Sequence, residues 1–458
     1  MLKVNLEDTI AAISTAVGSG GIGIVRISGK DALNIADSIF ISPKGKKLSE
    51  QKSHTIHFGN IVFENKIIDE VLVSVMKAPN TYTKEDIVEI NTHGGHMAVT
   101  SVLNSILNSG ARLAEAGEFT KRAFLNGRID LTQAEAVIDI INAKTRASAD
   151  AALLRLEGGL SKEIKTLREE ILLMMAHVEA GIDYPEHDDE TMTYNTIHIG
   201  TQSVIDNINR LISTADTGRI YKEGIKTVIL GRPNVGKSSL LNAFLNEDRA
   251  IVTDIEGTTR DVLEEYINIG EIPLKLIDTA GIRQTDNIIE QIGVEKSKKY
   301  ADEADLILLM LDGSKELSNE DKELIKMTSD KKTITLINKL DIGLNMDISS
   351  LESLKPIQIS VKDTKGIDDI YTAIKELFSL GDIKLNDDVL IAGERNKASL
   401  FNALASLKNV METINNDMPE DFITMDLKAA YEYLGEITGE ALEEDIIDKI
   451  FSEFCLGK

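Results

Sequence analysis

A glycine-rich loop at residues 231–238, with the sequence Gly-Arg-Pro-Asn-Val-Gly-Lys-Ser, constrains the fold of this chain more than any other feature. The loop fits the pattern G-x-x-x-x-G-K-[ST] at every fixed position, and it follows a buried-strand pattern at residues 225–230. A strand, such a loop and a helix start in this order predict a phosphate-binding loop, because backbone N–H groups and the helix dipole attract phosphate oxygens. This part of the chain is therefore expected to be an α/β domain.

Strand and helix patterns alternate around this loop, which predicts a mainly parallel sheet. The expected strands are 225–230, 262–269, 272–277, 305–311, 333–337 and 356–359. Only Gly270 and Glu271 join the second to the third, which is too short for a crossover, so this pair should be antiparallel. We expect a Ras-like domain at residues 219–380, inserted into a helical domain that is formed by residues 121–218 and 381–458.

Residues 1–120 show a pattern that is typical of an α+β domain. Strand patterns at residues 55–62 and 67–76 predict a hairpin that turns at Glu64-Asn65-Lys66. In the helical domain, Thr132 and Glu135 are expected to form a capping box at the start of a long apolar helix. The predicted fold is multidomain: an α+β N-terminal domain, an all-α domain and an inserted α/β domain.

Composition limits the partners and the compartment. The net charge of −25, from 50 basic and 75 acidic residues, argues against a broad basic surface, so a nucleic-acid substrate would need a local basic patch or a basic partner protein. A single cysteine excludes an internal disulfide and fits a reducing cytoplasm. No apolar run approaches about 18 residues, so we expect no membrane span.

Two later segments identify the base that the nucleotide carries. Asn338-Lys339-Leu340-Asp341 follows a predicted strand, and the Asp341 carboxylate can accept hydrogen bonds from the N1 and N2 donors of guanine, which adenine lacks. Ser360-Val361-Lys362 can supply a backbone N–H near guanine O6. With Asp278-Thr279-Ala280-Gly281 before them, these segments come in the order that a GTP-binding and GTP-hydrolysing domain needs.

The loop and the two switch segments are expected to hold the phosphates and magnesium. Lys237 should reach the β- and γ-phosphates, and Ser238 and Thr259 should ligate Mg²⁺. Asp278 should hold the metal through water, and Gly281 should donate its N–H to the γ-phosphate. The residues expected around GTP are Asn234, Val235, Gly236, Lys237, Ser238, Ser239, Thr253, Asp254, Ile255, Glu256, Gly257, Thr258, Thr259, Asp278, Thr279, Ala280, Gly281, Asn338, Lys339, Asp341, Ser360, Val361 and Lys362.

The residue that orients the attacking water is not given by the motif. Many GTPases place a glutamine directly after Asp-Thr-Ala-Gly, but Ile282 stands there in this chain. Glu290 is a candidate, although its spacing also fits an ordinary solvated helix charge. The side-chain oxygen of Asn234 could bind a monovalent cation, which would neutralise transition-state charge in place of an arginine finger.

Motifs outside the nucleotide domain make the resemblance specific. Residues 20–29 read Gly-Gly-Ile-Gly-Ile-Val-Arg-Ile-Ser-Gly, and residues 117–127 contain Gly-Glu-Phe-Thr and Arg-Ala-Phe-Leu-Asn-Gly. The last residues, Phe454-Cys455-Leu456-Gly457-Lys458, resemble a terminal Cys-Ile-Gly-Lys. With the nucleotide motifs, they give a chain that resembles the MnmE (TrmE) family of tRNA-modification GTPases over essentially its whole length.

The resemblance implies a second ligand site in the N-terminal domain. That domain is similar to folate-binding domains, so it would bind a one-carbon tetrahydrofolate in the 5-formyl or 5,10-methylene form. By family position the contacts would come from Arg26, Glu89, Arg128 and Lys458; Arg128 stands where the family can have lysine. Cys455 would lie near this site and take part in modification, or it would simply be a small apolar side chain.

The resemblance also implies a cation and partners. Glu290 would position the attacking water, and Asn234, Thr253, Ile255 and Thr258 would hold K⁺, which would let two GTPase domains meet. A homodimer would join an FAD-dependent flavoprotein, MnmG, in a heterotetramer. Together they would add an aminomethyl or carboxymethylaminomethyl group to C5 of the wobble uridine in certain tRNAs. The alternative is a GTP-dependent conformational switch in ribosome assembly without covalent chemistry.

Overall fold

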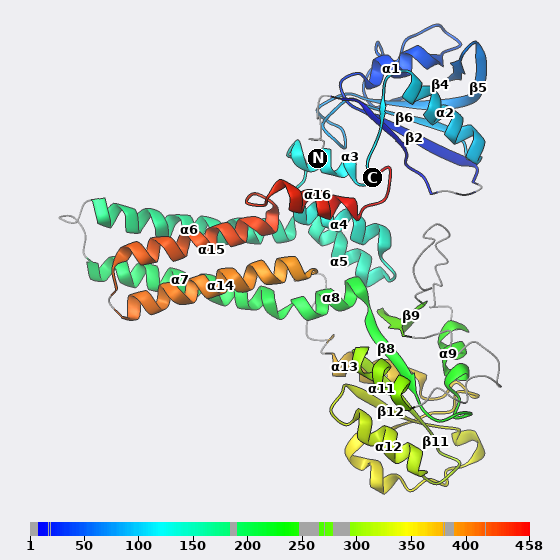
Figure 1. The fold of residues 1–458 in the computed structure, drawn as a ribbon, viewed down its shortest axis with the longest axis vertical. Helices are drawn as coiled ribbons and strands as arrows, with labels where there is room; N and C mark the ends of the chain where they lie inside the picture. The colour runs from blue at the N-terminus through cyan, green and yellow to red at the C-terminus, as the bar shows by residue number, and fades with distance from the viewer. Residues whose placement is uncertain are drawn as a thin grey trace. The chain divides into compact units, whose positions relative to one another are not determined.

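The computed structural model describes residues 8–16, 18, 20–183, 190–246, 265–269, 271–277, 294–378, 380, 389–416 and 418–458 (Figure 1). The chain forms two compact units, residues 1–138 with 434–458 and residues 139–433. The boundaries expected at residues 120, 218 and 380 stay predictions. Within the described residues, no helix is both long and apolar enough to cross a membrane.

The first unit is built on a seven-stranded sheet in the order β3-β4-β5-β6-β2-β1-β7. Neighbouring strands run antiparallel, except that β1 and β7 run parallel. The predicted hairpin is confirmed, because Glu64 and Asn65, both at positive φ, form the turn between β4 and β5. The strands are β1 (Ile10–Ile13), β2 (Ile22–Ser28), β3 (Phe40–Ile41), β4 (Thr55–Phe63), β5 (Lys66–Met76), β6 (Ile87–His93) and β7 (Arg112–Leu113).

Two cores hold the first unit together. Helices α1 (Ala32–Ile39) and α2 (His96–Asn108) bury apolar side chains against one face of the sheet. The second core surrounds Phe451, whose ring lies 6.0 Å from that of Phe124 and 5.2 Å from that of Phe454. This second core packs the last residues of the chain against residues near position 124. The helices that build it are α3 (Glu118–Leu125), α4 (Leu131–Asn142) and α16 (Glu444–Ser452).

Helix α4 is where the sequence predicts a helix, but the expected capping box is wrong. Asp130, not Thr132, caps it: the Gln133 N–H donates to Asp130 Oδ1 at 3.0 Å, and Gln133 Oε1 accepts from the Asp130 N–H at 3.0 Å. Aspartate is as good an acceptor as threonine at this position, and a glutamine three residues later can complete the reciprocal pair. The helix therefore begins earlier than the Thr-Gln-Ala-Glu pattern suggests.

Long helices from both sides of the nucleotide domain pack together in the second unit (Figure 1). Helix α7 lies along α6 and α14, and the Arg168 guanidinium on α6 lies 4.1 Å from the centre of the Tyr431 ring on α15. Residues that flank the nucleotide domain thus share one bundle, so the predicted insertion is confirmed. The helices are α5 (Arg146–Leu156), α6 (Gly159–Asp183), α7 (Glu190–Ser213), α8 (Ala215–Glu223), α14 (Glu394–Asn415) and α15 (Glu420–Thr438).

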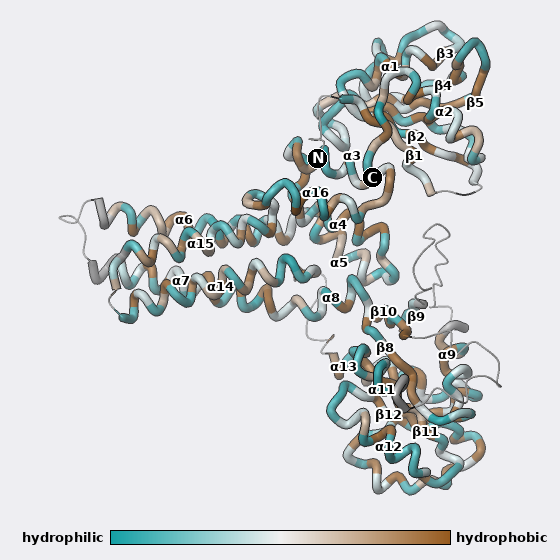
Figure 2. Tube along the Cα trace, viewed as in Figure 1, coloured by the Kyte–Doolittle hydropathy of each residue, from teal (hydrophilic) through white to brown (hydrophobic). Residues whose placement is uncertain are grey.

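The nucleotide domain has a six-stranded sheet in the order β13-β12-β11-β8-β10-β9. All described pairs are parallel except β9 with β10, as predicted. Its central strands are almost continuously apolar, which is typical of a parallel sheet covered on both faces (Figure 2). The strands are β8 (Ile225–Leu230), β9 (Glu265–Ile269), β10 (Ile272–Leu276), β11 (Leu306–Asp312), β12 (Thr333–Asn338) and β13 (Ile357–Gln358).

Helices flank this sheet and connect its strands. The α-helices are α9 (Lys237–Asn246), α11 (Val294–Glu303), α12 (Asn319–Thr328) and α13 (Ile367–Leu377). Two 3₁₀ helices, η2 (Leu340–Ile342) and η3 (Ile348–Leu354), follow β12. In such an open sheet, ligands bind beyond the carboxyl ends of the strands, where the strand order reverses. The predicted phosphate loop lies at the carboxyl end of β8, one of the central strands.

Candidate functional site

The phosphate loop lies between β8 and α9, and its Gly236 lies close against Asn338 at the end of β12. Gly236 has φ +110°, and a Cβ there would lie 2.4 Å from Asn338 Nδ2. Only glycine fits this conformation and this space. The same Asn338 Nδ2 donates to the Val235 carbonyl at 2.9 Å. Asn338, at the end of β12, thus fixes the loop by a hydrogen bond. Helix α9 begins at Lys237, so the N–H groups of its first turn face the loop.

Lys237 points back into the loop. Its Nζ donates to the carbonyl oxygens of Gly231 and Arg232, both at 2.8 Å. Burial lowers the pKa of Lys237, which means that the ammonium lacks full compensation for its lost hydration. An anionic phosphate at this position would supply that compensation. Ser238 and Ser239 follow on α9 and are exposed, as is Asn234, which has φ +61°.

The base-recognition residues converge on the same edge of the sheet. Asn338 Oδ1 accepts the Val361 N–H at 3.1 Å, so one amide side chain joins the phosphate loop to residues 360–362. Asp341 Oδ1 accepts from Ser360 Oγ at 3.2 Å, and Lys362 Nζ lies 3.8 Å from Asp341 Oδ2. These contacts fix the carboxylate that the sequence assigns to guanine. The structure therefore brings together the three described segments of the predicted GTP site.

Asp312 is a contributor to this site that the sequence reasoning missed. It ends β11, is 3% exposed, and accepts from Lys339 Nζ at 2.8 Å and from the Ser314 N–H at 3.1 Å. Burial alone would raise the pKa of Asp312, but the hydrogen bonds from Lys339 and Ser314 outweigh it and lower the pKa. The sequence offered one signal for this residue, because a carboxylate at the end of a fully apolar strand indicates a place at the ligand-binding edge of a parallel sheet. Asp312 holds the lysine of the Asn-Lys-Leu-Asp segment.

Part of the predicted site lies outside the described residues. This applies to both switch segments, so the structure does not test their roles in magnesium, potassium or water positioning. The residues concerned are Thr253, Asp254, Ile255, Glu256, Gly257, Thr258, Thr259, Asp278, Thr279, Ala280, Gly281 and Glu290.

In the first unit, Arg26 and Glu89 lie directly opposite each other on β2 and β6. Arg26 Nε donates to Glu89 Oε1 at 2.8 Å, and Arg26 Nη1 donates to the Gly457 carbonyl at 3.4 Å. Gly457 has φ +88°, and a Cβ there would lie 2.1 Å from the Ile13 carbonyl oxygen, so glycine is required. Ser14 Oγ also donates to the Gly457 carbonyl at 3.1 Å. The last residues of the chain thus lie beside the Arg26–Glu89 pair.

Arg128 reaches the same region through an aromatic side chain. The Tyr82 ring centre lies 4.8 Å from Arg128 Cζ and 5.7 Å from Arg26 Cζ, and Phe119 lies 5.5 Å from Arg26 Cζ. A hollow of about 410 Å³ opens next to Tyr82 and Arg128. Three of the four predicted folate contacts therefore lie together: Arg26 bonds to Glu89, and Arg26 and Arg128 both contact the Tyr82 ring.

Cys455 and Lys458 belong to the tail that carries Gly457. The Gly117 N–H donates to the Cys455 carbonyl at 3.3 Å, and the Lys458 N–H donates to the same carbonyl at 3.3 Å. Cys455 is a free, exposed thiol. Exposure alone assigns this thiol no chemistry, so a role in modification and a small apolar side chain both stay predictions.

The strand order, the phosphate loop and the carboxylate at Asp341 define the nucleotide domain as a GTP-binding P-loop GTPase. A family model described as "MnmE helical domain" matches residues 131–455, and one described as "GTP-binding protein TrmE N-terminus" matches residues 9–128. The chain belongs to the MnmE family of tRNA modification GTPases.

Similarity to members of this family extends over the full chain. The tRNA modification GTPase MnmE of Clostridioides difficile is 51% identical, over 99% of this chain and 100% of the relative. That of Geobacillus thermodenitrificans is 52% identical, over 98% and 99%. That of Acetivibrio thermocellus is 49% identical, over 99% of both chains.

Proposed function

We propose that this chain is a potassium-stimulated GTPase that works with an FAD-dependent flavoprotein, MnmG, on the wobble uridine of certain tRNAs in the cytoplasm. Together they add an aminomethyl or carboxymethylaminomethyl group to C5, with a one-carbon tetrahydrofolate as the carbon donor. The observation that carries the proposal is the Arg26–Glu89 pair beside Gly457, a second polar site in a chain that also holds a guanine-nucleotide site. A GTP-driven switch would need no such second site.

The described residues of the nucleotide site fit GTP. Lys237 is a partly buried cation at the start of α9, where phosphate oxygens would replace its carbonyl partners. Ser238 and Thr259 would ligate Mg²⁺, and Asn234 with Thr253, Ile255 and Thr258 would hold K⁺. Glu290 would position the attacking water. Exchange of K⁺ for Na⁺ should slow GTP turnover about tenfold or more; equal rates in the two salts would remove the potassium site.

The residues around Arg26 also fit a folate. A tetrahydrofolate carries N–H donors on its pterin ring and carboxylates on its glutamate, so it needs an acceptor at one end and cations at the other. Glu89 supplies a carboxylate, which Arg26 contacts at 2.8 Å, and Arg128 and Lys458 supply positive charge. Phe119 and Tyr82 offer flat apolar surfaces for the ring system. Cys455 would lie close enough to this site to take part in the modification.

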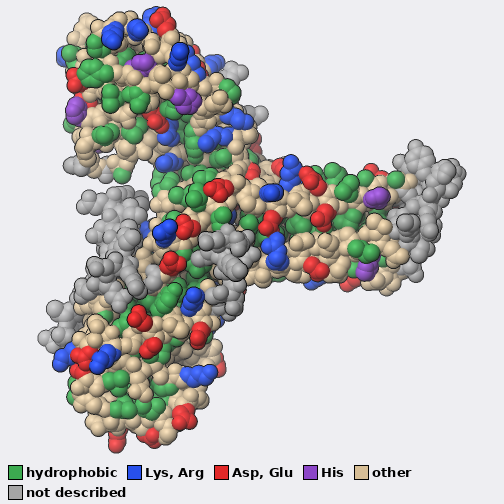
Figure 3. Space-filling model, turned by 180° about the vertical axis from the view of Figure 1, so that it is seen from behind, with side chains coloured by type: hydrophobic (Ala, Val, Ile, Leu, Met, Phe, Trp, Pro, Cys, Tyr) green, Lys and Arg blue, Asp and Glu red, His purple; other side chains and the backbone are tan. Residues whose placement is uncertain are grey.

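An apolar patch on the sheet supports a homodimer. Phe58 on β4 is 51% exposed and lies directly opposite Leu72 on β5, which is 49% exposed, with Ile56 at 67% on the same face. Figure 3 shows hydrophobic side chains gathered on the surface of this domain, in its upper part. Large apolar side chains that are adjacent and exposed mark interaction surfaces. We assign this face to a second copy of the chain, and the dimer would join the flavoprotein in a heterotetramer.

The wobble nucleosides of cells that lack the protein test the proposed reaction. Their tRNA should lose the C5-substituted uridine in mass spectra, and the wild-type chain should restore it. Lys237→Ala and Glu89→Gln should each fail to restore it fully, because they remove one site each. Unchanged modified uridine in the deletion strain would contradict the proposal and favour a switch without covalent chemistry.

A further inference from the structure

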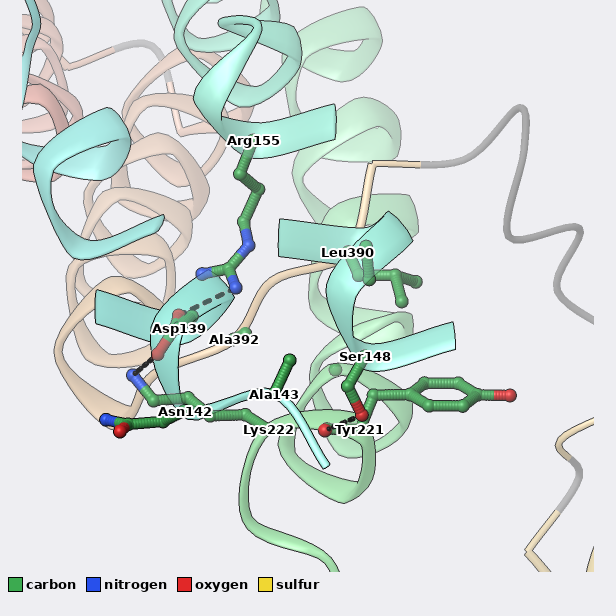
Figure 4. Close-up of a pocket in the computed structure, with 11 residues that line it drawn as sticks. Asp139, Asn142, Ala143, Ser148, Arg155, Tyr221, Lys222, Leu390 and Ala392 are labelled. Carbon is green, nitrogen blue, oxygen red and sulfur yellow. Dashed lines mark hydrogen bonds and ion pairs between the residues drawn. The ribbon is translucent and has the colours of Figure 1, made fainter. Parts of the chain in front are cut away.

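A small cavity lies among the helices of the second unit, where residues of α4, α5 and α8 meet residues 390–392 (Figure 4). Its volume is about 30 Å³, which gives room for roughly one or two water molecules or one small ion. Every residue of its wall belongs to the second unit. None of them takes part in the GTP site or in the candidate folate site, so the cavity needs an explanation of its own.

Three charged side chains form the polar part of the wall. Arg155 points from α5 toward Asp139 on α4, and Lys222 reaches the same carboxylate from α8, as Figure 4 shows. Arg155 Nη2 donates to Asp139 Oδ2 at 2.7 Å, and Lys222 Nζ lies 3.2 Å from Asp139 Oδ1. The side chains of Arg155 and Asp139 are 4% and 8% exposed. Two cations thus face one carboxylate, which leaves one positive charge in excess.

Arg155 has one donor left over. Its Nε atom is buried and has no hydrogen-bond partner among the residues that the structure describes. A buried N–H without an acceptor is rare and costly, because it has lost its hydrogen bonds to water and gained nothing in return. Since Arg155 lines the cavity, the missing acceptor is expected to lie inside it.

The chemistry of the wall favours an anion over water as that acceptor. Ala151, Leu390 and Ala392 supply an apolar surface, and all three are buried. A water molecule could accept from Arg155 Nε, but it would also have to donate two hydrogens, and each oxygen of Asp139 already faces a cation. An anion accepts from every donor and balances the excess charge. The apolar surface strengthens this attraction because little water screens it.

We propose that this cavity binds one small monovalent anion of the size of chloride. Arg155 Nε donates to the anion, Lys222 supplies the excess positive charge, and Asp139 holds both cations in place. An organic anion such as gluconate is far too large for the space. The site joins α5 and α8, so the bound anion should stabilise the packing of these two helices. The proposal does not depend on the tRNA modification proposed above.

Hydrogen exchange of the full chain measures the binding in solution. Potassium chloride replaces potassium gluconate at equal concentration, so that neither the potassium concentration nor the ionic strength changes. Amides of α5 and α8 should exchange more slowly in chloride, because the helices must release the ion before they separate. Above the dissociation constant, each tenfold rise in chloride should slow this exchange about tenfold.

Two substitutions should shift the chloride affinity in opposite directions. Lys222→Gln removes the excess positive charge and should weaken chloride binding about tenfold or more. Asp139→Asn keeps the shape of the side chain but removes the opposing charge, so it should strengthen binding by a similar factor. The matched control is Lys165→Gln, which removes an exposed lysine that also lies beside a carboxylate, Glu169 at 4.0 Å, away from the cavity. It should leave the affinity unchanged.

A crystal of the full chain soaked in bromide locates the ion. The proposal predicts an anomalous-scattering peak within hydrogen-bond distance of Arg155 Nε. An ordered water molecule there instead of the halide would overturn it, and so would equal chloride affinities in the wild type and all three variants. A bromide peak together with exchange that does not respond to chloride would mean an adventitious ion only, which also overturns the proposal. Lys222→Gln changes the most exposed of the three charges, so it decides the charge dependence if Asp139→Asn folds poorly.

Discussion

The GTP site and the candidate folate site are assembled in different ways. The phosphate loop takes its residues from one continuous stretch, 231–238, and two further short motifs complete the base site. The folate candidates Arg26, Glu89 and Arg128 come from three separate segments, and Gly457 lies 431 residues from Arg26 along the chain. Short contiguous motifs supply the residues of the first site, whereas strand pairing and packing of the tail bring together the single residues of the second. A single substitution in one site should therefore reduce GTP turnover or tetrahydrofolate affinity, but not both.

The largest expected effect is at Lys237. Lys237→Ala removes the cation that would face the β- and γ-phosphates, so kcat for GTP hydrolysis should fall about 100- to 1000-fold. Tetrahydrofolate affinity, measured by calorimetry on the same variant, should not change. Lys375→Ala on exposed α13 is the control, and it should keep full GTP turnover. Loss of folate binding in Lys237→Ala would break the proposed independence of the two sites.

Asp341→Asn should change the base preference. The amide replaces one acceptor with a donor, so guanine affinity should fall about 100-fold, and xanthine nucleotides should bind better than guanine nucleotides. Competition with a fluorescent nucleotide measures both affinities. Retained preference for GTP would show that Asp341 does not read the base.

A smaller effect is expected in the first unit. Glu89→Gln keeps the shape of the side chain but removes the charge that pairs with Arg26, so tetrahydrofolate affinity should fall about tenfold while GTP turnover stays the same. Glu70→Gln, at an exposed position on β5, is the matched control. If both variants bind folate like the wild type, the Arg26–Glu89 pair is structural only.

Asp312→Asn should have the smallest effect, and it should depend on pH. The folded-state pKa of Asp312 lies below its ordinary value of 3.8, so its carboxylate stabilises the fold above that pH and loses this contribution as pH falls through the folded-state pKa. At pH 7 the variant should lose about 1–3 kcal/mol in the free energy of unfolding of the nucleotide domain. The difference should shrink below about pH 4.

Chemical denaturation at several pH values measures this dependence. Asp330→Asn, on an exposed turn, should show no such loss. A stability difference between wild type and Asp312→Asn that stays constant down to pH 2 would contradict the role given to the ionised carboxylate.

Sequence patterns predict what is local. The strand expected at residues 225–230 is β8 with the same bounds, and the hairpin turn at Glu64 and Asn65 is where expected. The contact of Arg26 with the Gly457 carbonyl could not be predicted from local patterns, because only the packing of α16 brings the tail to β2. Asp312 was missed because the end of an apolar strand does not reveal that its carboxylate accepts from Lys339, a contact that only the pairing of β11 with β12 creates. The predicted capping box was wrong because two acceptors, Asp130 and Thr132, lie two residues apart at the start of this helix, and the sequence pattern favoured the second.

Transfer of isotope tests the central claim most directly. A reconstituted reaction with tRNA, the flavoprotein, GTP and tetrahydrofolate labelled with ¹³C at its one-carbon unit is digested to nucleosides and analysed by mass spectrometry. The account predicts one ¹³C atom in the C5 substituent of the wobble uridine, with less labelled product when Lys237→Ala or Glu89→Gln replaces the wild-type chain under single-turnover times. Unlabelled wobble uridine in the complete wild-type reaction would contradict it.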